Sequence, residues 1–162
     1  MILPDLLAPG LDIVFCGTAV GAESARRRAY YAGPGNAFWP ALHKVGLTPR
    51  QFRPEEYEQL LDFGIGLTDL AKEISGNDDI LSARHFDADR LRALMARYRP
   101  RILAFTGKRA AQQFVGRPVD YGSIAERVGS TQLFVLPSPS GAACRYWSTA
   151  PWQALAQLSH AR

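Results

Sequence analysis

The feature that most constrains the fold is a short apolar run that ends in a glycine. Residues 11–17 read LDIVFCG, in which four consecutive apolar side chains follow Asp12. A run of this kind is typical of a strand that is buried on both faces of a parallel sheet. Similar runs at 101–107 and 132–137, and a shorter one at 66–70, predict three more strands. The chain is therefore expected to form around a buried parallel sheet.

Helical segments are predicted between these strands and after the last of them. They cover residues 36–45, 54–63, 87–98, 108–115 and 151–160. The alternation of strands and helices predicts an α/β fold, a three-layer α/β/α sandwich with a short, mostly parallel central sheet. The length of 162 residues is ordinary for one domain, and the sequence contains no repeat or long linker. We therefore expect residues 1–162 to form a single domain.

Composition and charge limit the classes of partner. Lysine and arginine number 19 against 15 aspartates and glutamates, and the net charge of +4 permits a polyanionic partner without requiring one. Cys16 and Cys144 lie far apart and form no ligand cluster, so neither a zinc site nor a disulfide framework is expected. The first residues do not resemble a signal peptide, and no apolar run approaches the ~20 residues of a membrane span. We expect a cytoplasmic protein with no membrane contact.

Functional residues are expected in the loops that follow the strands, because ligands bind at the carboxyl ends of the strands in open α/β sheets. The loop at 17–21 reads GTAVG, and its glycines let the backbone approach a ligand and direct N–H groups at negative charge. The loop at 137–141 reads PSPSG, whose prolines give a rigid backbone that can wedge between stacked bases. Taken singly, each segment also fits an ordinary turn or a strand-to-helix connection.

A polar, arginine-rich loop is expected after the first strand. It contains Arg26, Arg27 and Arg28, followed closely by Tyr30 and Tyr31. Cations beside aromatic faces suit a nucleic-acid backbone and an unpaired base. The alternative is a solvated loop with both tyrosines packed into the core.

Five segments occur in an order and spacing that is specific in combination. They read VFCGTAVG at 14–21, GPGNAFW at 33–39, GLTDL at 66–70, GKRAA at 107–111 and LPSPSG at 136–141. Together they resemble the mismatch-specific uracil-DNA glycosylases, relatives of thymine-DNA glycosylase. The resemblance implies an enzyme that flips uracil, or a mispaired thymine or related pyrimidine, out of double-stranded DNA and hydrolyses its N-glycosidic bond, leaving an abasic site. It also implies a monomer near the nucleoid that needs no metal or cofactor.

The sequence departs from the family pattern where the chemistry is expected. Ala19 stands in place of the asparagine that positions the attacking water, and Ser138 replaces the asparagine that opens the last motif in close relatives. Alanine cannot hydrogen-bond water. Asp69, at the carboxyl end of the strand at 66–70, is the candidate catalytic residue, because a carboxylate can orient water or counter the positive charge of an oxocarbenium-like sugar. The alternative roles for Asp69 are a helix N-cap and a surface ion-pair partner.

The other site residues are carried over from the resemblance. Tyr31 matches the aromatic residue that stacks on the flipped base, and the backbone amides of Thr18 and Tyr31 face the pyrimidine. Asn36 shapes the loop ahead of its helix as a cap. The base-binding set is Gly17, Thr18, Ala19, Tyr31, Asn36 and Ser138. The set that binds DNA or fills the space of the flipped nucleotide is Arg26, Arg27, Arg28, Ser140, Gly141, Ala142, Ala143 and Arg145.

Two other functions stay open at this point. The changes at Ala19 and Ser138 also suit a protein that binds lesions or mismatches on the same fold without hydrolysing them. A nucleotide-binding enzyme is suggested only by the glycine-framed first loop, and the sequence lacks a phosphate-binding lysine or a ribose-binding acid at the right spacing. The position of Asp69 distinguishes the glycosylase from the binding protein, since in the glycosylase its carboxylate faces the pocket.

Overall fold

The computed structural model describes residues 2–76 and 85–161, and its centre is a five-stranded sheet in the order β2-β1-β3-β5-β4. The parallel strands are β1 (Ile13–Gly17), β2 (Ile65–Asp69), β3 (Ile102–Phe105) and β5 (Thr131–Val135). The edge strand β4 (Gly122–Val128) runs antiparallel to β5. The mostly parallel sheet that the apolar runs predict is therefore confirmed.

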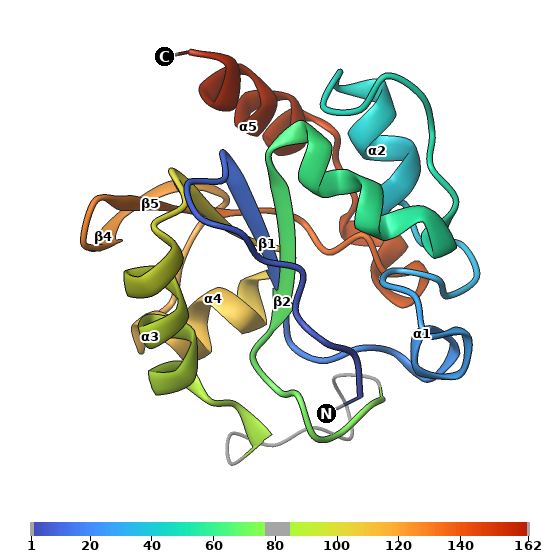
Figure 1. The fold of residues 1–162 in the computed structure, drawn as a ribbon, viewed down its shortest axis with the longest axis horizontal. Helices are drawn as coiled ribbons and strands as arrows, with labels where there is room; N and C mark the ends of the chain where they lie inside the picture. Colours follow the sequence, from blue (N-terminus) through green and yellow to red (C-terminus); the bar gives the residue numbers. More distant parts are fainter. Residues whose placement is uncertain (1, 77–84, 162) are drawn as a thin grey trace.

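Helices cover both faces of this sheet and complete a three-layer α/β/α arrangement (Figure 1). One face carries α2 (Phe38–Lys44), the 3₁₀ helix η1 (Pro54–Phe63) and α5 (Ala150–His160). The other face carries α3 (Ala88–Tyr98) and α4 (Lys108–Val115). The predicted helices are all present, although α2 begins at Phe38 rather than at Asn36.

The strand β1 shows why the sequence folds into layers. Its side chains alternate between the faces, so that Ile13 and Phe15 join the core beneath α2 and α5, whereas Val14 and Cys16 join the core beneath α3 and α4. All five of its residues are buried. A continuous apolar run is what a strand covered on both faces requires.

Two elements correct the sequence-based expectation. The arginine-rich segment expected as a loop begins with a helix, α1 (Ala22–Arg27), which ends where Arg28 adopts a left-handed φ of 53°. The sequence does not predict the strand β4, because an edge strand is covered on one side only and its residues alternate between half-buried and exposed. Its charged Glu126 and Arg127 hide the apolar pattern on which the prediction depends.

The sheet brings the carboxyl ends of β1 and β2 side by side. Gly17 pairs with Asp69 in register, and the following residues continue the contact, with Leu70 N–H donating to the Gly17 carbonyl at 3.0 Å. On the outer side of β2, the amino-terminal segment forms a bridge between Leu6 and Leu67. Within the part of the chain that the structure describes, no helix has the length and apolar character needed to cross a membrane.

Candidate functional site

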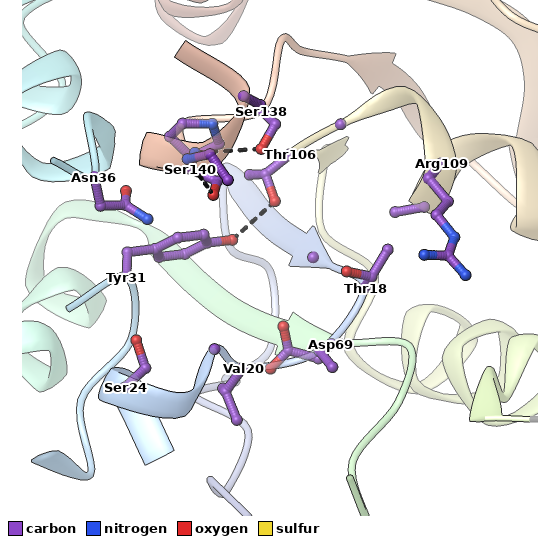
Figure 2. Close-up of a pocket in the computed structure, with 18 of the residues that line it drawn as sticks. Thr18, Val20, Ser24, Tyr31, Asn36, Asp69, Thr106, Arg109, Ser138 and Ser140 are labelled. Atoms are coloured by element: carbon purple, nitrogen blue, oxygen red, sulfur yellow. Dashed lines mark hydrogen bonds between the residues drawn. The ribbon is translucent and has the colours of Figure 1, made fainter. Parts of the chain in front are cut away.

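A cavity of about 520 Å³ lies at the carboxyl ends of the parallel strands (Figure 2). This volume lies within the roughly 300–1,000 Å³ that is usual for small-molecule sites. Of the residues predicted for the site, those that line the cavity are Gly17, Thr18, Ala19, Tyr31, Asn36, Asp69, Ser138, Ser140, Ala142 and Ala143. Those outside the lining are Arg26, Arg27, Arg28, Gly141 and Arg145. The structure thus gathers the expected base-binding set around the cavity and leaves the four predicted arginines outside its lining.

The floor of the cavity is a small gap above Gly17. A β-carbon added to Gly17 would lie 3.0 Å from Asp69 Oδ1, 3.3 Å from Thr106 Oγ1 and 3.6 Å from the Tyr31 hydroxyl oxygen. Three polar groups from separate segments therefore converge on one point, and glycine is the residue that leaves this point open. A small polar reactant such as water has hydrogen-bonding partners at this place.

Asp69 is the only one of these groups that carries a charge, and it is almost fully buried, with 3% of its surface exposed. Burial raises the pKa of Asp69 above its ordinary value, while the neighbouring Lys72 ammonium acts in the opposite direction. The Lys72 Nζ lies 3.3 Å from Asp69 Oδ2. Asp69 is thus an ion-pair partner, but the pair is buried and not at the surface as that alternative has it, and Asp69 also lines the cavity.

Tyr31 is held in an unusual conformation at the wall of the cavity. Its φ is 54°, in the left-handed region that bulky residues seldom adopt. Its ring stacks on Phe38 with 3.9 Å between the centroids and 15° between the planes, and its hydroxyl hydrogen-bonds Thr106 Oγ1 at 3.0 Å. Burial and the Asp69 carboxylate both raise the pKa of Tyr31, so the phenol stays protonated at neutral pH. Backbone strain at a lining residue is a common mark of a functional position.

The segment NAFW at 36–39 explains how this conformation is held. The Asn36 Oδ1 accepts a hydrogen bond from the backbone N–H of Phe38 at 3.0 Å and so holds the loop ahead of α2, although the N-cap position itself is occupied by Ala37 and not by Asn36 as expected. The Trp39 indole donates to the Tyr30 carbonyl at 3.0 Å. The Ala37 N–H donates to the Pro139 carbonyl at 2.8 Å and joins this loop to the one after β5. The motif therefore acts mainly by holding the backbone of the loops that form the cavity wall.

The two tyrosines after the arginines differ in how deeply they are buried. Tyr30 is 1% exposed and packs edge-on against Tyr57 with 5.3 Å between the centroids, which is the core packing that the second of the two interpretations describes. Both tyrosines are among the residues that line the cavity, and Tyr31 is the less buried of the two.

The arginine triplet is partly engaged within the protein. Arg27 binds Glu55 through two nitrogens, at 2.8 and 2.9 Å, and donates to the Ala32 carbonyl at 3.0 Å. Arg26 forms an ion pair with Glu23 one turn away. Arg28 is exposed and follows α1 in the left-handed conformation.

The loop after β5 leads into a short 3₁₀ helix, η4 (Gly141–Tyr146). Ser138 Oγ accepts a hydrogen bond from Ser140 N–H at 3.2 Å. Gly141 packs against the opposite loop so closely that a β-carbon there would lie 2.6 Å from the Pro34 carbonyl oxygen. Because Gly141 faces that loop, Ala142 and Ala143 are the members of the predicted wedge that reach the cavity.

Several lining residues were not among the predicted site residues. They include Val20, Ser24, Thr106, Lys108, Arg109, Tyr121 and Tyr146. Thr106 directly follows the strand β3, so the strand-end rule could have found it. Tyr121 and Tyr146 are exposed aromatic residues, and no local pattern in the sequence brings them to the cavity. The Lys108 ammonium lies 4.5 Å from the centre of the Tyr121 ring, which gives the rim a cationic and aromatic character.

Comparison with known proteins shows the family. Residues 4–159 match the model of the uracil DNA glycosylase superfamily. A solved structure of similar fold is the solution NMR structure of a candidate uracil DNA glycosylase from Methanosarcina acetivorans, with a TM-score of 0.66 and 24% sequence identity. The match covers 98% of this chain and 97% of that one. The chain therefore belongs to the uracil DNA glycosylase superfamily.

Proposed function

We propose that the protein is a DNA glycosylase of the mismatch-specific type, which flips uracil out of double-stranded DNA and hydrolyses its N-glycosidic bond. Mispaired thymine and related pyrimidines are the further candidate substrates. The superfamily match over residues 4–159 supports DNA glycosylase activity. The restriction to mispaired bases rests on the motif resemblance, and weakly paired bases cost least to open.

One observation carries the proposal, namely a buried carboxylate at the floor of the cavity. Asp69 Oδ1 lies on the cavity side, beside the gap above Gly17, while its Oδ2 faces Lys72. The family asparagine is replaced by Ala19, which also lines the cavity and cannot bind water. Asp69 is therefore our candidate for the group that this asparagine supplies in relatives.

The chemistry assigned to Asp69 follows from the reaction. The bond between C1′ and the base nitrogen breaks, and its electron pair leaves with uracil, which creates an anion and an oxocarbenium-like sugar. A carboxylate at the floor stabilises the positive sugar and accepts the proton of the water that attacks C1′. The uracil anion then takes a proton from solvent. No metal or cofactor enters this scheme.

Base capture is assigned to the wall of the cavity. One face of the Tyr31 ring is covered by Phe38, and we propose that the other face stacks on the flipped base. The backbone N–H groups of Thr18 and Tyr31 are proposed to bind the acceptor edge of the pyrimidine, and Asn36 and Ser138 to complete the polar wall. Contacts made by the main chain do not depend on side-chain identity, so the changes at Ala19 and Ser138 would leave them in place.

Duplex DNA is proposed to lie across the mouth of the cavity. Arg26, Arg28 and Arg145 are exposed cations that can bind phosphates on either side of it. We assign the space left by the flipped nucleotide to Ala142 and Ala143, together with Ser140. The protein is proposed to act on this duplex as a monomer.

A second function, binding of DNA lesions without hydrolysis, is favoured by one feature. The methyl group of Ala19 stands in the place of the asparagine that binds water in relatives. If Asp69 serves only as the partner of Lys72, the same cavity would capture a flipped base without hydrolysing the bond. The protein would then bind lesions or mismatches without repairing them itself.

The test is a cleavage assay on duplexes that carry a single U:G, U:A or T:G pair and on a matched C:G duplex. Alkali converts abasic sites to strand breaks, and mass spectrometry identifies the released base. We expect strand breaks and free uracil from the U:G duplex and no break in the C:G control. Specific binding to the U:G duplex with no released base would instead support the second function.

A further inference from the structure

Lys72 is a buried cation to which the proposed chemistry assigns no part. It lies three residues after Asp69, and only 4% of its side chain is exposed. Its Nζ lies 3.3 Å from Asp69 Oδ2 and 3.2 Å from Asp5 Oδ1, and it donates to the Tyr30 hydroxyl at 3.1 Å. An ammonium group has three protons to donate, and here three acceptors surround it. The orientation of Lys72 is therefore fixed.

The contact with Lys72 divides the two oxygens of the Asp69 carboxylate between two environments. Lys72 holds Oδ2 from behind the floor of the cavity, whereas Oδ1 lies 3.0 Å from the place of a β-carbon on Gly17, beside Thr106 and Tyr31. A rotation of the carboxylate would break the ion pair. The contact thus fixes the direction of Oδ1 toward the cavity.

The anchor on the far side of Lys72 is built by distant parts of the chain. Asp5 accepts a hydrogen bond from Thr68 Oγ1 at 2.6 Å and forms an ion pair with Arg90 of α3. Arg90 also donates to the backbone carbonyl of Asp69 at 3.4 Å. The amino-terminal segment, β2 and α3 therefore meet at one network in which two carboxylates face two cations.

Within residues 2–76 and 85–161, the ionisable groups that interact with the Asp69 carboxylate come from several separate segments. They are Lys72, Asp5, Arg90, Cys16, Tyr30 and Tyr31. Burial raises the pKa of Asp69, Lys72 lowers it by charge and by hydrogen bonding, Asp5 raises it, and Arg90 lowers it. Lys72 is thus the strongest influence that favours the charged carboxylate.

On the basis of the proposed glycosylase activity, we propose that Lys72 is a positioning residue, which keeps the Asp69 carboxylate ionised and directs its Oδ1 at the reacting sugar and water. Lys72 touches neither substrate nor water in this account. It acts by making a deeply buried carboxylate available as an anion, which the reaction requires at the floor of the cavity.

The first test measures Asp69 itself in the free protein. The side-chain carboxyl carbon of Asp69 is followed by ¹³C NMR as a function of pH in the wild type and in Lys72→Gln. Loss of an adjacent opposite charge is expected to raise the midpoint by about 1–3 pH units. Lys72→Arg keeps the charge and should stay close to the wild type. An unchanged midpoint in a folded Lys72→Gln protein would overturn the inference.

A second variant decides the matter if Lys72→Gln does not fold. Asp5→Asn removes a negative charge that opposes ionisation of Asp69, so the midpoint is expected to fall rather than rise. Lys44→Gln, at an exposed position near the end of α2, is the matched control and should leave the midpoint unchanged. A rise or no change in folded Asp5→Asn would contradict the proposed network.

The third measurement tests whether the charge state of Asp69 controls the reaction rate. The single-turnover rate of uracil release is recorded against pH, and the loss of activity on the acidic side should move to higher pH in Lys72→Gln by the same amount as the NMR midpoint. A merely structural role would lower the rate at every pH and leave the midpoint in place, which would overturn the inference. A wild type that releases no uracil would refute the proposed function, while NMR would still report whether Lys72 controls the charge of Asp69.

Discussion

At the scale of single residues, the gap above Gly17 is the place where the proposed chemistry is most sensitive to change. We expect Gly17→Ala to reduce the rate of uracil release by about 10²-fold, because its methyl group would stand 3.0 Å from Asp69 Oδ1 and displace the reacting groups. Binding of duplex DNA should change little, since the methyl group lies at the bottom of the cavity. The measurement is a single-turnover assay accompanied by a titration with labelled DNA.

Gly33→Ala is the matched control for this substitution. A β-carbon on Gly33 meets nothing within 4 Å, and Gly33 does not have a positive φ. It should therefore retain the wild-type rate. Equal rates for Gly17→Ala and the wild type would show that the reaction does not use the gap.

Tyr31 offers a second prediction at this scale, because two substitutions separate its ring from its hydroxyl. Tyr31→Phe keeps the ring on Phe38 and loses only the hydrogen bond to Thr106, so capture of the base should be nearly unchanged. Tyr31→Ala removes the stacking face and should weaken capture of the base by about 1–3 kcal/mol, roughly 5- to 150-fold in the dissociation constant. The dissociation constant for a U:G duplex is compared with that for a C:G duplex. A loss of the same size in both variants would assign the role to the hydroxyl instead.

The candidate catalytic residue could be predicted from the sequence, but its surroundings could not. Asp69 stands at the end of an apolar run, and the rule for strand ends is enough to direct it toward a site. Its partner Lys72 is local, whereas Asp5 is 64 positions away from Asp69 and reaches the network because the amino-terminal segment pairs with the outer side of β2. No periodicity or motif reports such a contact.

At the scale of elements, the contact between η4 and the loop at 33–36 is expected to position both sides of the cavity mouth. Gly141→Ala would bring a β-carbon to 2.6 Å from the Pro34 carbonyl oxygen, and backbone cannot move aside cheaply. We expect a loss of about 1–3 kcal/mol in the free energy of unfolding, measured by denaturant titration. Ala142→Ser, at an exposed position of the same helix, should cost much less. Equal stability for both variants would mean that η4 can shift without resistance.

Elements were predicted well where they are buried on both sides and poorly where they are not. The apolar runs of β1, β3 and β5 carry their own signal, since each strand lies between two layers of helices. The edge strand β4 has one exposed side and a mixed pattern, and α1 is a six-residue helix whose only buried residue is Ser24. A short helix with so little burial has almost no periodic pattern to detect.

At the scale of the whole molecule, the net charge of +4 should govern how the protein meets DNA. The logarithm of the binding constant should fall linearly with the logarithm of the salt concentration, because phosphate contacts release counterions. Arg28→Gln is expected to reduce this slope by about one for each phosphate contact that is lost. Anisotropy titrations at several salt concentrations measure the slope.

The control for the salt dependence lies at the opposite end of the molecule. Arg97 is exposed in the last turn of α3, which leads to the amino end of β3 and so lies away from the cavity. Arg97→Gln should leave the slope unchanged. If both substitutions alter the slope alike, the segment around α1 is not part of a specific DNA interface.

The most direct test of the account is the single-turnover rate of uracil release from a U:G duplex by Asp69→Asn. Asparagine keeps the size of the side chain but can neither carry the charge nor accept a proton, so the rate should fall by at least about 10²-fold while DNA affinity stays close to that of the wild type. Asp62→Asn, at an exposed position of η1, should retain the full rate. An Asp69→Asn protein that releases uracil as fast as the wild type would contradict the central claim that this buried carboxylate performs the chemistry.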